Sequence, residues 1–440
     1  MLLGERKAGA AGQARDLGLR EFNSRSVHPS CVGELEMGDW AMPDRLSLAF
    51  MLLILAFSSM DASSAPRTDP QTGRVRVLFL GEVASDNALF LGWIATDPQF
   101  VMTRVPLSTE HISMTEALRF ARIYLPRSEE ALWTRYDVTV FEDFTPVVIP
   151  ASLFEWIQSS ASRGMGIELI ELVNWVGIGN DIERWMALDF YRVFPAEVVL
   201  NDVGAQFGRT YYKVLNPDGP LSLPGIESVP LNRGHHGDMI PRPGSTTEAI
   251  WSGRQTPCMV TSTYGEGRTL HLGHGWDNIP DEPRVHYEFL IDYIFNQLFY
   301  IAKLAYPEDL PLVHRIRTMF VSFEDRRRGT LGVVDFVERF GANPTKALQL
   351  LDSAELGLQS ASSMYLSGRY EEAADTLDDL LDQFPGIDEE LMRSKSRALL
   401  WVYAVEWISV LGVSMVCGSS LWILMVRRRL YRGVSVTRAF

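Results

Sequence analysis

The sequence predicts an α/β fold: an open, mostly parallel sheet flanked by helices, followed by a helical hairpin and one transmembrane helix. Three observations lead to this prediction. Residues 136–179 have the pattern of strand, helix, glycine turn and strand; an apolar strand precedes them at Arg74–Leu80; and an uncharged apolar run, Ile408–Val426, lies near the C-terminus. A strand connected through a helix to a second strand of the same sheet forms a parallel pair with it.

The unit at residues 136–179 contains each part of this pattern. Its first strand, Val138–Phe141, is rich in β-branched residues, and the helix Pro150–Ser162 has apolar residues at helical spacing. Gly164 and Gly166 end that helix, because glycine accepts a left-handed backbone without steric cost. A second apolar run, Ile167–Val173, then predicts a buried strand.

The elements on either side follow from similar patterns. We expect Arg74–Leu80 to be the first strand, Ser108–Tyr124 a crossover helix and Pro283–Tyr300 a closing amphipathic helix. Later strands, of which the last two form a hairpin, are expected at Ile250–Trp251, Cys258–Ser262 and Arg268–Leu272. We therefore assign residues 74–300 to one α/β domain.

Composition narrows the classes of function. A chain of 440 residues holds roughly two to three domains if each takes ~150. The formal net charge of −14 argues against nucleic-acid binding, which needs a basic surface. Cys31, Cys258 and Cys417 lie in three different regions and predict neither a disulfide framework nor a zinc site. No motif predicts a cofactor.

The N-terminal residues predict export. Residues 1–41 are rich in Gly, Ala and Arg without apolar periodicity, and we expect no fold there. Leu46–Phe57 is apolar but shorter than the ~20 residues of a membrane span, and the small residues Ser63–Ala65 follow it. We therefore expect a signal peptide at residues 42–65, with Met42 as an alternative start and an uncleaved signal anchor as the alternative structure.

The C-terminal residues predict a membrane span. Residues 399–426 are apolar apart from Glu406 and are long enough to cross a hydrocarbon core of ~30 Å. Arg427, Arg428 and Arg429 begin a basic tail, residues 427–440, which the positive-inside rule places in the cytoplasm. The sequence thus predicts a single-pass plasma-membrane protein with its N-terminal domain outside the cytoplasm.

Between the domain and the span, we expect a connector at residues 301–332 and a helical hairpin stalk at 333–398. An apolar stripe at helical spacing begins at Ala347. The spacing of Tyr365, Gly368, Tyr370 and Ala373 then resembles the turn of a tetratricopeptide repeat. Because solenoids need about three such units for stability, this single unit predicts a stalk more than a peptide-binding array.

A series of weak motifs recurs in a recognisable order along residues 74–300. DVTVFEDF, from Asp137, is followed by a helix, by SRGMGIELIE and by FPAEV; later come Arg242-Pro243-Gly244 and the Tyr264–Arg268 hairpin. This order resembles the membrane-associated branch of the class I glutamine amidotransferase-like superfamily. The resemblance implies a flavodoxin-like sheet and, in active members, a cysteine nucleophile on a tight turn with a distant His and Glu.

The catalytic cysteine of that superfamily has no counterpart here. The matching turn follows Gly166-Ile167, and the residues Glu168–Glu171 there include neither Cys nor Ser. Cys258 lies in a later apolar strand, where we expect a buried, inert thiol. The sequence therefore predicts a non-catalytic domain, with no catalytic residue and no metal ligand assigned.

Polar residues at the expected carboxyl ends of the strands are the candidate ligand-binding residues, because ligands of open α/β sheets bind at these ends. They are Glu82, Asp143, Glu171, Asn174, His274 and Asp277. The preferred hypothesis is an ectodomain that binds a partner protein of the envelope or a small ligand. The alternatives are a metal-assisted or carboxylate-based hydrolase, a structural subunit of an envelope complex, or merely solvated loop ends.

Overall fold

The structure, a computed structural model, describes residues 66–83, 88–109, 111–170, 188–199, 209–232, 238–253, 255–276, 287–339, 341 and 343–437. The expected N-terminal preamble, residues 1–41, and the expected signal peptide, residues 42–65, lie outside the described residues.

The α/β part is built on one eight-stranded sheet, which confirms the predicted mostly parallel architecture. Its first five strands in spatial order are mutually parallel: β2 (Phe100–Pro106), β1 (Val75–Gly81), β3 (Val138–Glu142), β4 (Gly166–Ile170) and β12 (Gly267–Leu272). Three antiparallel strands continue the sheet: β11 (Pro257–Tyr264), β10 (Thr246–Trp251) and β7 (Tyr212–Val214). The predicted strand–helix–strand unit is therefore β3, α5 (Ala151–Ser162) and β4.

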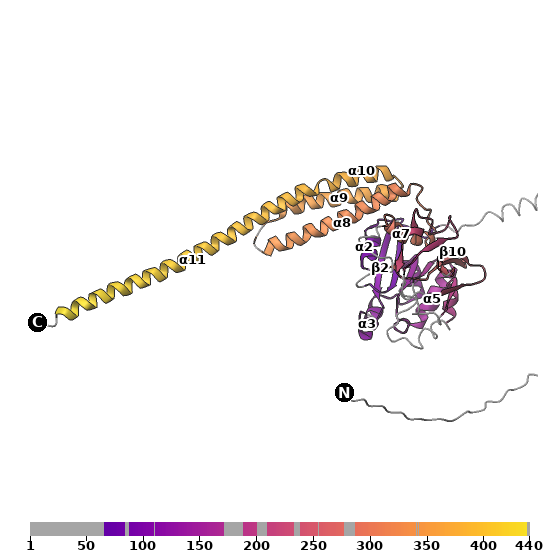
Figure 1. Cartoon of the computed structure of the whole chain (residues 1–440), viewed down its shortest axis with the longest axis horizontal. Coiled ribbons are helices and arrows are strands. Elements are labelled where there is room, and N and C mark those ends of the chain that lie inside the picture. Colours follow the sequence, from indigo (N-terminus) through magenta and orange to yellow (C-terminus); the bar gives the residue numbers. More distant parts are fainter. Residues whose placement is uncertain are drawn as a thin grey trace, which may run out of the picture. The chain divides into compact units, whose positions relative to one another are not determined.

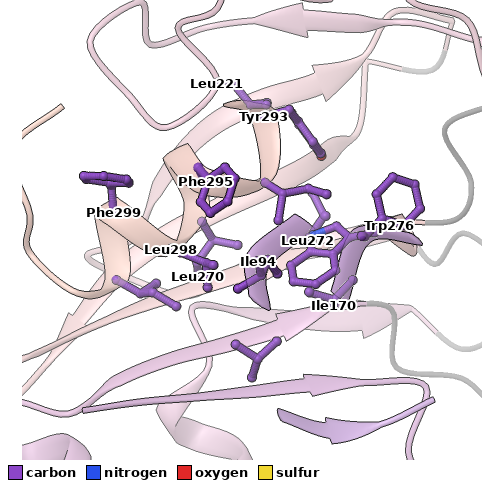
Figure 2. Close-up of a cluster of buried hydrophobic side chains, with 14 of the residues drawn as sticks. Ile94, Ile170, Leu221, Leu270, Leu272, Trp276, Tyr293, Phe295, Leu298 and Phe299 are labelled. Atoms are coloured by element: carbon purple, nitrogen blue, oxygen red, sulfur yellow. The ribbon is translucent and has the colours of Figure 1, made fainter. Parts of the chain in front are cut away.

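Helices cover both faces of the sheet. Side chains of a strand alternate between its two faces, so an apolar strand needs cover on each. In β1, Val77 and Phe79 pack with helices α2 (Ala88–Thr96) and α7 (Leu290–Ile301), whereas Leu78 and Leu80 pack on the opposite face. That opposite face is covered by three helices, α3 (Met114–Tyr124), α4 (Glu129–Arg135) and α5. Figure 2 shows the core on the α7 side, with Leu270 and Leu272 of β12 beside Phe295 and Leu298 of α7.

Short elements complete this part of the chain. Two small antiparallel pairs are β5 (Ala196–Val199) with β9 (Asp238–Pro241) and β6 (Arg209–Thr210) with β8 (Leu231–Asn232). The described 3₁₀ helices are η2 (Pro146–Val148), η3 (Asp189–Val193) and η5 (Ile226–Ser228).

The two glycine motifs of the sequence have structural roles. In Arg242-Pro243-Gly244, the Ser245 N–H donates to Arg242 O at 3.1 Å and Gly244 has φ +86°, so the motif is the turn between β9 and β10. In the β11–β12 hairpin, Gly265 has φ +59°, and a Cβ there would lie 2.4 Å from Ser162 O at the end of α5. Glycine is required where the hairpin meets this helix.

The helical part is larger than predicted. Residues 310–332 of the expected connector belong to α8 (Leu310–Arg339), which packs with α9 (Thr345–Leu366), α10 (Tyr370–Leu381) and the start of α11 (Phe384–Thr437). The expected hairpin is α9 and α10, with Gly368 at φ +76° in the turn between them. In α8, Ile316, Phe320 and Phe323 are at helical spacing and buried, but the charged residues 324–328 interrupt this pattern in the sequence.

Helix α11 is the candidate membrane span. It runs without a break from Phe384, which is buried in the bundle, to Thr437 (Figure 1). Its stretch from residue 405 to 432 is exposed, and it is long and apolar enough to cross a membrane. The hydroxyls of Ser409 and Ser420 donate to the carbonyls of Val405 and Val416, so neither needs a polar partner from outside the helix.

A buried ion cluster joins the sheet part to the bundle. The Arg317 guanidinium of α8 lies 2.5 Å from Asp292 of α7 and 3.3 Å from Asp97, which follows α2. Tyr365 of α9 donates to Asp97 at 3.1 Å, and His314 lies 2.6 Å from Asp292. Although burial lowers the pKa of Arg317, Tyr365 and the two carboxylates raise it overall, so this arginine stays charged in the interior.

Candidate functional site

The carboxyl ends of β1 and β3 meet where the strand order of the sheet reverses. β2 pairs with one side of β1 and β3 with the other, in the order β2-β1-β3-β4-β12. In open α/β sheets, successive loops diverge at such a point, and ligands bind there. Glu82 follows β1 and Asp143 follows β3, so two of the predicted site residues lie at this position.

The backbones of the two strands are locked together at this edge. Gly81 is in register with Glu142, and the Glu82 N–H donates to Glu142 O at 3.1 Å. A Cβ on Gly81 would lie 1.6 Å from the same carbonyl oxygen, which leaves no room for any other residue. The Leu107 N–H, just beyond β2, donates to Gly81 O at 3.0 Å and ties the third strand end to the first two.

Hydroxyl groups gather at the same strand ends, one of them beside the Asp143 carboxylate. Ser108 and Thr109 follow β2, and Thr145 follows β3. Ser108 Oγ donates to Asp143 Oδ2 at 3.4 Å, and Thr145 Oγ1 accepts the Thr109 N–H at 3.1 Å. Asp143 itself has φ +40°, a left-handed backbone that is uncommon outside glycine but tolerated by aspartate. Ser108 and Thr109 were not predicted, because the strand before them was not recognised, and Thr145 was not singled out after the predicted strand Val138–Phe141.

A third carboxylate, Glu142, lies just below this edge. It is 1% exposed and accepts the backbone N–H of Trp276 at 3.1 Å. The Trp276 indole N–H in turn donates to Gln297 Oε1 of α7 at 2.9 Å, and its ring stacks on Phe79. Glu142 therefore connects the end of β3 to the loop after β12 and to α7.

His274 belongs to a buried aromatic cluster. Its Nε2 contacts the hydroxyls of Tyr212 and Tyr293, and its Nδ1 lies 2.7 Å from Gly275 O. Because a carbonyl only accepts, Nδ1 carries the proton and Nε2 accepts from tyrosine. The imidazole is 0% exposed, and burial raises the pKa of both tyrosines. This cluster is a fixed part of the interior.

Cys258 is the buried, inert thiol that the sequence predicts. It is 0% exposed, and burial raises the pKa of its thiol well above the ordinary value. A nucleophilic cysteine needs the thiolate and an approach for its substrate, and this residue has neither.

The remaining predicted site residues, Glu171, Asn174 and Asp277, lie outside the described residues. Within the part of the chain that the structure describes, no group of three or more His, Cys, Asp or Glu side chains is placed to hold a metal ion.

The position we matched to the catalytic turn must be corrected. Gly164 precedes β4 and Gly166 is its first residue, so Glu168 lies in the middle of that strand and not on a turn after it. A nucleophile of an α/β enzyme would follow β4, because the carboxyl ends of the strands form the site. The sequence that follows β4, residues 171–187, contains no Cys, Ser or Thr.

Glu168 is instead a carboxyl group in the core. It is 0% exposed, neither carboxyl oxygen has a hydrogen-bond partner, and burial raises its pKa from 4.5 to about 8. It shares its face of β4 with Ile170, toward α7. The sequence contained a signal for this buried group, because Glu168 is an acidic residue within an otherwise apolar strand.

Comparisons with known proteins leave the family open. No protein-family model matches the chain, and no curated protein matches it. Among solved structures, it is similar to the cytoplasmic protein STM3548 from Salmonella typhimurium (16% identity, TM-score 0.42), over 52% of this chain and 99% of that one. The cytoplasmic protein STM1381 from Salmonella typhimurium LT2 is similar over 52% and 98% (14% identity, TM-score 0.38). A β-galactosidase from Bacillus circulans sp. alkalophilus matches over 53% of this chain and 31% of its own (9% identity, TM-score 0.30).

Proposed function

We propose that this chain is a single-pass membrane protein whose α/β domain binds a small polar ligand, or a polar group of a partner protein, at the ends of β1 and β3. The observation that carries this proposal is the gathering of Glu82, Asp143, Ser108, Thr109 and Thr145 where the strand order reverses. Carboxylates and hydroxyls are mainly acceptors, so the ligand carries hydroxyl or amino groups.

We further propose that the domain is a non-catalytic relative of the class I glutamine amidotransferase-like superfamily. The strand order β2-β1-β3-β4-β12 is that of flavodoxin-like sheets, and this supports the resemblance. The buried Cys258 and the sequence of residues 171–187, which lacks a Cys, Ser or Thr, support the absence of glutaminase chemistry. Glutamine hydrolysis by the purified full-length chain, above that of a Cys258→Ala control, would overturn this part of the proposal.

Ligand binding is tested by thermal unfolding of the full-length chain in lipid nanodiscs with polyols, sugars, amino acids and polyamines. A ligand at 100 times its Kd stabilises the folded state by about 2.7 kcal/mol, which raises the Tm measurably. We expect one class to raise the Tm, and we expect Asp143→Asn and Thr109→Val to abolish the rise. The exposed Glu155→Gln on α5 is the control and keeps it. A rise that survives both substitutions, or no rise with any class, contradicts the proposed site.

The membrane orientation is part of the same proposal. The apolar residues 399–426 form the span, the basic tail 427–440 lies in the cytoplasm, and the signal peptide 42–65 exports the domain. Protease added to intact cells is expected to digest the α/β domain and to spare an epitope tag at the C-terminus. Digestion of the tag alone would show that the orientation is the reverse of the proposed one.

A further inference from the structure

One edge of the main sheet is open. Val75 N–H donates to Gln99 O and Leu107 N–H donates to Gly81 O, so the odd-numbered residues of β2 face β1. In a parallel ladder the alternate residues then direct their N–H and C=O groups away from the sheet. The alternate residues are Phe100, Met102, Arg104 and Pro106. The Phe100 carbonyl accepts from the Arg74 guanidinium at 2.9 Å, but within the described chain no group bonds to the backbone of Met102 or Arg104.

The opposite edge of the sheet is capped at one residue by the chain itself. β7 is the last strand there, and the Val214 N–H donates to Glu227 Oε1 at 2.7 Å. A side chain from another element that bonds to an edge strand hinders pairing of that strand with another chain. The open groups of Met102 and Arg104 on β2 lack this protection.

A cleft of about 520 Å³ lies beside the open edge. It is lined by Gly92 and Ala95 of α2, by Arg104 of β2 and by Phe320, Glu324 and Arg328 of α8. Arg104 donates to Leu91 O but pairs with no carboxylate of the described chain, and burial lowers the pKa of its guanidinium. Glu324, the acidic residue of the cleft, is already paired with Arg327 at 3.2 Å. An acidic group of a ligand would therefore be the counter-charge for Arg104.

The two faces of the edge strand differ in character. Arg104 and Met102 direct their side chains to the α2 face, whereas Val101 lies on the other face and is 43% exposed. In a pair of strands, side chains that lie opposite each other extend to the same face. A strand added to β2 would therefore place one set of side chains toward Arg104 and the alternate set beside Val101.

We propose that the open edge of β2 and the adjoining cleft bind an extended segment of a partner protein in which acidic and apolar residues alternate. The segment pairs as an extra strand with the backbone of Met102 and Arg104. Its acidic side chains enter the cleft beside Arg104, and its apolar side chains cover Val101. This surface is separate from the ligand site at the ends of β1 and β3.

The test uses the full-length chain in nanodiscs and a labelled eight-residue peptide of alternating Glu and Val, with binding measured by fluorescence anisotropy. Proline at position 102 removes the outward N–H and leaves the ladder to β1 intact. We expect Met102→Pro and Arg104→Gln each to raise the Kd by at least about tenfold. Arg119→Gln, on the exposed side of α3, is the matched control for loss of a positive charge.

Further peptides keep the test valid if a variant folds poorly. A peptide methylated on the backbone nitrogens that face β2 is expected not to bind, and neither is one in which Lys replaces Glu. Binding of the methylated peptide, or equal binding by Met102→Pro and the unchanged chain, overturns the proposal. So does self-association of the chain that Met102→Pro abolishes without any peptide, because a second copy would then occupy the edge.

Discussion

Replacing Glu168 with Met is expected to stabilise the protein near neutral pH. Its carboxyl group is buried in the centre of the sheet without a hydrogen bond, and burial raises its pKa from 4.5 to about 8. Each pKa unit corresponds to about 1.4 kcal/mol, so holding this group in the core costs about 3 kcal/mol at pH 7. Methionine has a similar volume and no charge to desolvate.

The direction of the pH dependence follows from the raised pKa. Between pH 4.5 and about 8 the folded state holds a proton at Glu168 that the unfolded state releases. The stability from this group is therefore complete below pH 4.5 and is lost as the pH rises to about 8, by about 5 kcal/mol in all. Glu168→Met removes this loss, so the two proteins differ little at pH 5 and most at pH 8.

The assay is thermal unfolding of both proteins in nanodiscs from pH 5 to pH 8.5. A gain of about 3 kcal/mol at pH 7 corresponds to roughly 6–12 °C in Tm for a domain of this size. Glu155→Gln, an exposed substitution on α5, is the control and should follow the unchanged protein. The reasoning is refuted if Glu168→Met is less stable at pH 8, because Glu168 would then be an ionised group with a stabilising partner.

Three other substitutions test the packing described above. Arg317→Met leaves Asp97 and Asp292 buried without their cation, so we expect the free energy of unfolding, measured by chemical denaturation, to fall by about 3–5 kcal/mol. Most of this loss should be recovered in a triple variant in which both acids are also changed to Asn. An equal loss in the triple variant would contradict the argument. Gly81→Ala forces apart the ends of β1 and β3 and should lower the free energy of unfolding by about 3 kcal/mol or more. It should also abolish any rise in Tm that a ligand causes. Gly265→Ala should lower the Tm more than Gly244→Ala, because both glycines are left-handed but only Gly265 would clash, with Ser162 O; equal effects would show that the contact is unimportant.

The sequence predicted the centre of the sheet well, because that part is governed by apolar runs and glycine. Strands β1, β3 and β4 and helix α5 lie where the patterns placed them, since strands buried on both faces are continuously apolar. The pair α2 and β2 was missed. Helix α2 is apolar on all sides, and β2 contains Thr103 and Arg104 because it is an edge strand, so neither shows a clean period.

The candidate site could be predicted only in part, because only the residues that follow a recognisable strand could be placed. Glu82 and Asp143 were found because each follows a recognisable strand. Ser108, Thr109 and Thr145 reach the same place through β2 and a tertiary contact that no local pattern encodes. His274 was assigned to the same rim, but its Nε2 is held by two tyrosines, one of which comes from α7, and its Nδ1 by Gly275 O.

The unbroken course of α11 has a mechanical consequence. The helix that contributes Phe384, Ile387 and Leu391 to the bundle core is the same helix that supplies the candidate span, without a swivel between them. One residue inserted near Trp401 would turn the apolar stretch by about 100° and shift it by about 1.5 Å relative to the bundle. The rotation of the candidate span about the helix axis is therefore fixed by the packing of the bundle.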